Sequence, residues 1–282
     1  MAINTNSGEG TTTNYVGFSS FLGSLTLETA ANKKAYADAK ALVGEAVVKK
    51  SFSGLGTDSA TAKARKHLKE AKVPVGFSIS GKLKNVFYRE NEDPATKNKY
   101  ENLRVFLQDE VGGVKENTIL TLDMGSDLAQ KLIQKLEYAI PGEEVEIGAW
   151  SSLEANPKDP DGPLYAKHNV SVKQNGLEVK VAEGVKHYDV VKVLVDEKYA
   201  KLEGADFKRA ENKEMFAKAR KSVGISYFKE ILGRIEAHYK TTAAEHEESD
   251  QHHVASESDE GGASYEDGEF SIDPAAAVPG AK

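Results

Sequence analysis

The order of predicted elements between residues 77 and 173 constrains the fold of this chain more than any other feature. Three strand patterns come first, at Phe77–Glu90, Tyr100–Glu110 and Asn117–Asp123. A helix pattern follows them. Two further strand patterns then cover Glu143–Trp150 and Leu164–Lys173. The resulting order is three strands, one helix and two strands.

The helix between the third and fourth strands is well defined in the sequence. Either Ser126 or Asp127 supplies a capping side chain, and Pro141-Gly142 ends the pattern. A helix at this point in a five-strand order is how an OB-fold barrel is connected. We therefore expect a mainly β fold with flanking helices (α+β), built on an OB-like barrel of five or six strands. The apolar stripe of the helix consists of Leu128, Leu132, Ile133 and Leu136.

Other patterns lie on both sides of this region. Asn175-Gly176 predicts a hairpin turn into a sixth strand at Leu177–Glu183, and His187–Asp196 is predicted to extend the sheet further. Helices are predicted at Asn32–Lys50, at Lys63–Lys72 after a cap at Thr57 or Asp58, and over Asp206–Lys240 with a break near Gly224. Lys63–Lys72 is rich in lysine, which is typical of a solvated helix face and also suits a phosphate backbone.

These patterns divide the chain into five segments. Residues 15–28 are dense in aromatic and apolar side chains, which predicts either an arm docked on the body or an exposed arm that reaches a neighbouring subunit. The predicted segments are a disordered N-terminus (1–14), the arm with a helical extension (15–72), the barrel (73–200), C-terminal helices (201–240) and a disordered acidic tail (241–282).

The net charge of −7 conceals an asymmetry. Eleven carboxylates and one lysine follow Lys240, so the tail carries −10, and the remaining 36 Lys and Arg against 33 Asp and Glu give the body +3. The sequence contains no cysteine, which excludes disulfides and thiolate metal sites. We find neither a signal-peptide pattern nor an apolar run of about 20 residues, so we expect a cytoplasmic protein without a membrane partner, in the host cytoplasm if a phage encodes it.

Strand alternation predicts which side chains leave the core. In Tyr100–Glu110, Leu103 faces inward, so Arg104 and Phe106 face outward. Gly81 predicts a bulge, and beyond it alternation does not assign Tyr88 to a face. Flanking helices that cover Phe106 and Trp150 are the alternative to an exposed binding face. The candidate nucleic-acid-binding residues are Lys82, Lys84, Tyr88, Tyr100, Arg104, Phe106, Trp150, Tyr165 and Lys167.

This mixture of cations and aromatic rings suits single-stranded nucleic acid. Bases stack on aromatic faces while lysine and arginine neutralise the backbone, without a base-specific code. No cofactor, metal or catalytic constellation is recognisable: Ser53–Thr57 lacks the Gly-Lys-Ser/Thr of a phosphate loop, and the histidines have no metal-ligand or triad spacing. We therefore expect a protein that is not an enzyme.

The element order over Phe77–Lys173 and the acidic tail from Glu245 resemble the OB-fold single-stranded-DNA-binding proteins of phage and bacterial replication. Tails of that family commonly end in acidic residues beside an aromatic one, whereas this tail continues through IDPAAAVPGAK. The resemblance implies a protein that coats exposed single strands, of DNA or alternatively RNA, during replication or recombination. It also implies that the tail recruits partner proteins and competes for the basic surface. The partner-binding tail residues are Tyr265, Glu266, Asp267, Glu269 and Phe270.

A structural or assembly protein of a phage is the alternative function. In that case the aromatic arm and the last helix make subunit contacts. The sequence leaves the oligomeric state open in both cases.

Overall fold

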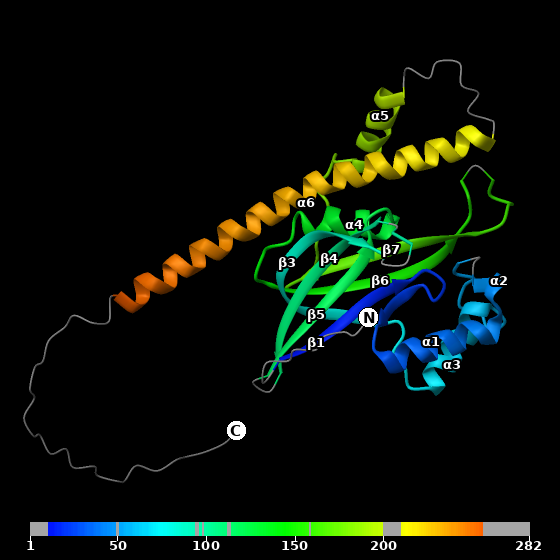
Figure 1. Cartoon of the computed structure of the whole chain (residues 1–282), viewed down its shortest axis with the longest axis horizontal. Coiled ribbons are helices and arrows are strands. Elements are labelled where there is room, and N and C mark those ends of the chain that lie inside the picture. Colours follow the sequence, from blue (N-terminus) through cyan, green and yellow to red (C-terminus); the bar gives the residue numbers. More distant parts are fainter. Residues whose placement is uncertain are drawn as a thin grey trace, which may run out of the picture. The chain divides into compact units, whose positions relative to one another are not determined.

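The computed structural model describes residues 11–48, 51–93, 96–97, 99–111, 114–157, 159–199 and 210–255. The chain divides into two compact units, residues 1–242 and 243–282. The first unit contains the whole sheet, and most of its elements are labelled in Figure 1. Of the second unit, only the final turns of the last helix lie in the described ranges.

Eight strands form one mixed sheet with the order β2-β1-β5-β4-β3-β6-β7-β8. Neighbours are antiparallel except β1 and β5, which are parallel. β2 also pairs with β6, through Ser24 and Trp150. The strands are β1 (Thr11–Ser19), β2 (Ser24–Leu27), β3 (Ser78–Glu92), β4 (Lys99–Val111), β5 (Val114–Asp123), β6 (Glu144–Glu154), β7 (Tyr165–Gln174) and β8 (Leu177–Glu178).

The predicted order of three strands, one helix and two strands is confirmed by β3 to β7 with a helix between β5 and β6. The predicted sixth strand is reduced to the two residues of β8. Residues 15–28 form most of β1 and all of β2, so they dock in the sheet rather than project as an arm. Residues 11–14, expected to be disordered, are strand because they pair with β5.

Six helices lie in the described ranges, and three begin at a capping side chain. The hydroxyls of Thr29, Ser59 and Ser126 each accept a hydrogen bond from the backbone N–H group three residues further along the chain. The cap of the second of these helices is thus Ser59, not Thr57 or Asp58 as expected. The helices are α1 (Ala30–Val43), α2 (Glu45–Val48), α3 (Ala60–Glu70), α4 (Asp127–Leu136), α5 (His187–Tyr199) and α6 (Ala210–Ala255).

Three predictions about these helical segments need correction. Gly44, at a φ of 87°, divides the predicted helix Asn32–Lys50 into α1 and α2. The predicted strand His187–Asp196 is the helix α5, because His187, Val191 and Val195 are buried at intervals of four residues. α6 continues through Gly224 and extends to Ala255, although residues after 240 were expected to be disordered.

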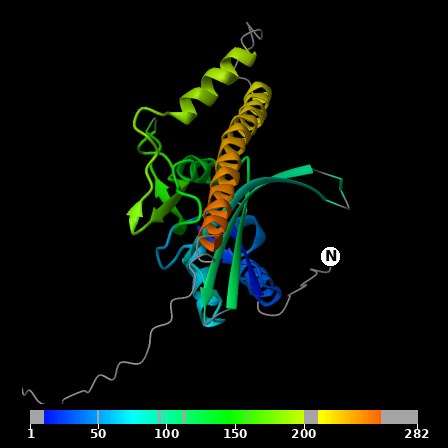
Figure 2. The same cartoon turned by 90° about the vertical axis from the view of Figure 1, so that its left-hand side faces the viewer.

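One face of the sheet carries the main core, and α4 and α6 cover it (Figures 1 and 2). Leu103, Val105 and Leu107 of β4 are completely buried in this core, together with Leu132 of α4 and Phe228 of α6. A second cluster joins α1 and α3 to the turn between β1 and β2. Helices therefore cover the core face of the central strands.

β3 is long because it serves two neighbours. Its first half pairs with β6 and its second half with β4, and the register shifts between Leu83 and Asn85. Gly81 lies where the strand changes partner and has a φ of +145°, which disfavours any residue with a side chain. A Cβ at this position would also lie 3.1 Å from the carbonyl oxygen of Gln108. The predicted bend is confirmed, but the extra residue in the ladder is Lys84 rather than Gly81.

Gly81→Ala is expected to lower the free energy of unfolding by about 1–3 kcal/mol, because it adds both backbone strain and a contact with a carbonyl oxygen. Urea denaturation of the full chain measures this change. Gly56→Ala is the matched control, since a Cβ at Gly56 meets no atom within 4 Å. Equal stability of the two variants would contradict this account of Gly81.

Candidate nucleic-acid interface

The sheet face opposite the core is formed in its central part by β1, β5, β4 and β3, and we call this surface the outer face. Because Leu103, Val105 and Leu107 point into the core, alternation places Arg104 and Phe106 on the outer face. Both are half-buried, and Phe106 does not belong to the main core cluster. The aromatic and arginine side chains of the outer face are Tyr15, Phe87, Arg89, Tyr100, Arg104 and Phe106.

Strand pairing brings these side chains together. Phe106 lies opposite Ile119 of β5, which in turn lies beside Tyr15 of β1. Arg104 lies directly opposite Phe87 of β3. Residues directly opposite in a ladder have Cβ atoms about 4.5–5.5 Å apart, so these positions form a continuous surface of rings and guanidinium groups.

Arg89 lies next to the Arg104–Phe87 pair, opposite Asn102. Partial burial lowers the pKa of the Arg104 guanidinium, and the nearby positive charge of Arg89 lowers this pKa further. Within the described ranges no ion pair engages either arginine, and the Nε atom of Arg104 is buried without a hydrogen-bond partner. Two adjacent cations without a carboxylate are suited to binding an anion.

Lys82 and Lys84 extend the outer face along β3, and both are exposed. Lys82 lies opposite Gln108 of β4 and Glu144 of β6. Tyr100, at the other end of β4, is 50% exposed. Five of the nine residues that we predicted from the sequence therefore lie along one stripe of the outer face: Lys82, Lys84, Arg104, Phe106 and Tyr100.

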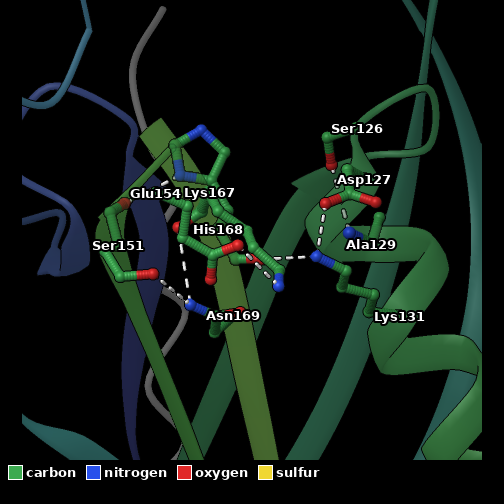
Figure 3. Close-up of polar contacts among 10 residues, drawn as sticks. Ser126, Asp127, Ala129, Lys131, Ser151, Glu154, Lys167, His168 and Asn169 are labelled. Atoms are coloured by element: carbon green, nitrogen blue, oxygen red, sulfur yellow. Dashed lines mark hydrogen bonds and ion pairs between the residues drawn. The ribbon is translucent and has the colours of Figure 1, made fainter. Parts of the chain in front are cut away.

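Trp150, Tyr165 and Lys167 lie in a different place, on β6 and β7. Trp150 is 46% exposed, so the alternative in which a helix covers it is wrong. Lys167 donates to Glu154 at 3.0 Å (Figure 3), and this contact raises the pKa of the lysine. β7 is three strand positions from β4, about 14 Å across the ladder, so Tyr165 and Lys167 do not belong to the stripe. Trp150 lies on β6 beyond Gly148, which pairs with the first residue of β3, so it lies past the end of the stripe.

Figure 3 also shows how the core side of this region is held. The hydroxyl of Ser151 and Nδ1 of His168 are 2.7 Å apart, and Lys131 donates to the carbonyl oxygen of His168 at 2.7 Å. Lys131 also pairs with Asp127 at 2.6 Å. These contacts connect α4 to β7 and account for the polar groups there, so we assign them a structural role.

Tyr88 lies on the core face, beside α6. Its hydroxyl donates to Glu101 at 2.8 Å, Lys229 of α6 forms an ion pair with the same carboxylate, and the ammonium group of Lys229 lies 4.1 Å from the centre of the Tyr88 ring. Burial alone would raise the pKa of Glu101, but the hydrogen bonds from Lys229 and Tyr88 lower it overall. Tyr88 is therefore engaged in holding α6 on the sheet.

Glu101→Gln is expected to destabilise the chain by about 1 kcal/mol at neutral pH. A carboxylate with a lowered folded-state pKa stabilises the fold above its unfolded-state pKa, and the effect is lost as pH falls through the folded-state pKa. The difference between wild type and variant should therefore disappear below the usual pKa range of Glu. Urea denaturation between pH 3 and 7 measures it, with Glu183→Gln, an exposed residue, as control. A difference that is independent of pH would contradict the proposed role of the ion pair.

Tyr15, Phe87 and Arg89 also lie on the outer face but were not predicted from the sequence. The extra residue at Lys84 reverses the alternation of β3, so a regular strand pattern cannot place Phe87 and Arg89. The one clue in the sequence is the apolar Val86 after the polar Asn85. Val86 is completely buried in the structure, so the next residue, Phe87, faces the other side of the sheet. The position of Tyr15 depends on the parallel pairing of β1 with β5, which no local pattern indicates.

The tail residues Tyr265, Glu266, Asp267, Glu269 and Phe270 lie outside the described residues. In the part of the chain that the structure describes, no three His, Asp or Glu side chains form a group able to hold a metal ion. None of the helices in the same ranges has both the length and the apolar character needed to cross a bilayer.

Comparison with known proteins found no match among protein-family models, curated proteins or solved structures. The functional assignment must therefore rest on the geometry and chemistry of the site.

Proposed function

We propose that this chain is a non-catalytic single-stranded-DNA-binding protein and that the outer face of β1, β5, β4 and β3 is its binding surface. The observation that carries the proposal is the pair Arg89 and Arg104, which lies among aromatic rings and has no carboxylate partner in the described ranges. Unpaired bases stack on Phe87 and Phe106, and the arginines neutralise phosphates.

The proposed binding is independent of base sequence. Every base has a face that stacks on an aromatic ring, and arginine and lysine recognise phosphate regardless of the base attached. A protein with these properties coats exposed single strands during replication or recombination. RNA presents the same phosphates and rings, and is the alternative ligand.

An OB-like barrel is part of this proposal. The pairings from β2 through β1, β5, β4 and β3 to β6, with the additional contact between β2 and β6, support a closed arrangement. Such a ring would consist of β1, β2 and four of the five strands expected from the sequence (β3, β4, β5 and β6), with β7 outside it and paired to β6. Small barrels of this type commonly bind oligonucleotides on one face of the sheet.

The acidic tail has two proposed roles. Its carboxylates compete with nucleic acid for the cations of the outer face, and its aromatic residues recruit replication or recombination proteins when DNA displaces the tail. The charge of −10 after Lys240 against +3 in the body supports an electrostatic competition that salt weakens.

The alternative of a phage structural protein has a weaker basis. Its aromatic arm would be residues 15–28, which pair within the sheet of their own chain as β1 and β2. The C-terminal helix of this alternative would be α6, but its apolar residues Phe228, Ile231 and Leu232 are already buried in the main core of their own chain. This alternative would be favoured if light scattering detects large assemblies whose size does not change when nucleic acid is added.

The double variant Arg89→Ala/Arg104→Ala tests the proposed surface. We expect at least a tenfold loss of affinity for a single-stranded oligonucleotide at low salt. Each lost phosphate contact reduces the slope of log K against log salt by about 0.7, so the slope should become shallower by about 1.4. Fluorescence anisotropy over a salt series measures both values, and Lys192→Ala/Lys198→Ala on the exposed surface of α5 is the control.

Phe106→Ala tests the stacking contribution separately. Loss of one stacked base costs about 1–3 kcal/mol, so affinity should fall by roughly 5- to 150-fold without a change of salt slope. Tyr138→Ala removes an aromatic side chain that is 40% exposed elsewhere and serves as control. The proposed surface is refuted if these outer-face variants bind single strands as tightly as their controls do.

Deletion of residues 245–282 is expected to strengthen binding, and most strongly at low salt, because the tail then no longer competes electrostatically for the cations. The same anisotropy titration measures the change. A full-length chain and a truncated chain of equal affinity at all salt concentrations would exclude self-competition.

A further inference from the structure

A second basic surface lies on α3, outside the sheet. Lys63, Lys66 and Lys69 recur every third residue, are exposed, and form no ion pair within the described ranges. We call them the α3 lysine row. Six residues of helix span about 9 Å, so the row presents three separate ammonium groups over a short distance.

The opposite side of α3 is fixed to the sheet. Thr61, Ala64 and Leu68 are completely buried. The Arg65 guanidinium donates to the carbonyl oxygens of Leu22 and Gly23 at 2.8 and 3.0 Å. Both acceptors belong to the turn between β1 and β2, so α3 has a fixed position relative to the strand that carries Tyr15.

The turn that holds α3 lies at one end of the outer face. β1 and β5 are parallel, so β1 ends on the side of the sheet where β5 ends at Asp123. The outer-face stripe on β4 leads from Phe106 past Arg104 to Asn102, which pairs with Asp123 on this same side. A strand lying along the stripe therefore leaves the sheet on the side where α3 is anchored.

A groove borders the α3 lysine row. It has a volume of about 660 Å³, with Leu42, Val43 and Val47 of α1 and α2 on one side and α3 on the other. Lys63 and Lys66 line the α3 side, together with His67 and the carboxylates of Asp58 and Glu70. Leu42 is 62% exposed. An apolar wall opposite unpaired ammonium groups suits the alternating bases and phosphates of a flexible single strand.

We propose that the α3 lysine row and its groove form a second contact zone for the same single strand that the outer face binds. The lysines pair with phosphates, and bases lie against the apolar wall. This inference rests on the proposed function and extends it, because it predicts that the binding site is longer than the sheet alone. A short oligonucleotide fills only the outer face, whereas a longer one reaches α3 as well.

The test compares the full chain with the variant Lys63→Gln/Lys66→Gln/Lys69→Gln on oligonucleotides of about 8 and about 24 nucleotides, lengths chosen around the site size of one OB fold. We expect unchanged affinity for the short oligonucleotide and at least a tenfold loss for the long one at low salt. The salt slope for the long oligonucleotide should become shallower by about 2, since three phosphate contacts are removed. The control variant is Lys186→Gln/Lys192→Gln/Lys198→Gln, which removes three exposed lysines elsewhere.

The possible failures are distinguishable. If the α3 variant matches the control on both oligonucleotides while Arg89→Ala/Arg104→Ala weakens the short one, this inference alone is wrong. If the wild-type chain binds neither oligonucleotide, the proposed function fails and this inference fails with it. If the effect of the α3 variant vanishes in a chain truncated before Glu245, the lysine row contacts the acidic tail, and that result also overturns the proposal.

Discussion

Complete burial of Leu103, Val105 and Leu107 fixes the orientation of every other side chain of β4. Burying a Leu or Val side chain contributes about 1.5–3 kcal/mol, and a shift of one residue would expose all three while placing Arg104 and Phe106 in the core. This alternation is the reason that a guanidinium and a ring lie together on the outer face. The same residues that stabilise the sheet thus determine which side chains remain available to a ligand.

The helix α6 packs on the core face of the sheet and leaves the outer face uncovered by this helix. Phe228, Ile231 and Leu232 pack on the core cluster, and Lys229 pairs with Glu101 at the margin of the sheet. Gly224 lies where an added Cβ would be 3.2 Å from the side chain of Gln130, so its small size permits close contact between α6 and α4. In the sequence this glycine resembled a helix break, whereas in the fold it serves packing within a continuous helix.

Much of the sheet could be predicted because β3 to β7 carry regular local patterns, and the faces of β4 followed from simple alternation. Lys84 limited the prediction for β3, since one extra residue reverses the alternation beyond it. In α5, the β-branched run at Val190–Val195 favours a strand locally, but contacts spaced by four residues make it a helix. The places of β1 and β2 depend on pairing with distant strands, which short-range patterns do not encode.

The positive side chains of this protein lie in two different environments. Lys229, Arg234 and Lys167 each pair with a glutamate, at positions where they connect elements of the fold. Arg89 and Arg104 instead lie beside each other among aromatic rings, where mutual repulsion and the unpartnered Nε of Arg104 both oppose folding. A nearby carboxylate would offset the repulsion between the two arginines and could accept a hydrogen bond from the Arg104 Nε. A purely structural role therefore does not explain why no carboxylate pairs with them in the described ranges. In the function proposed above, a phosphate of the bound strand takes the place of that carboxylate and relieves both terms only while the strand is bound.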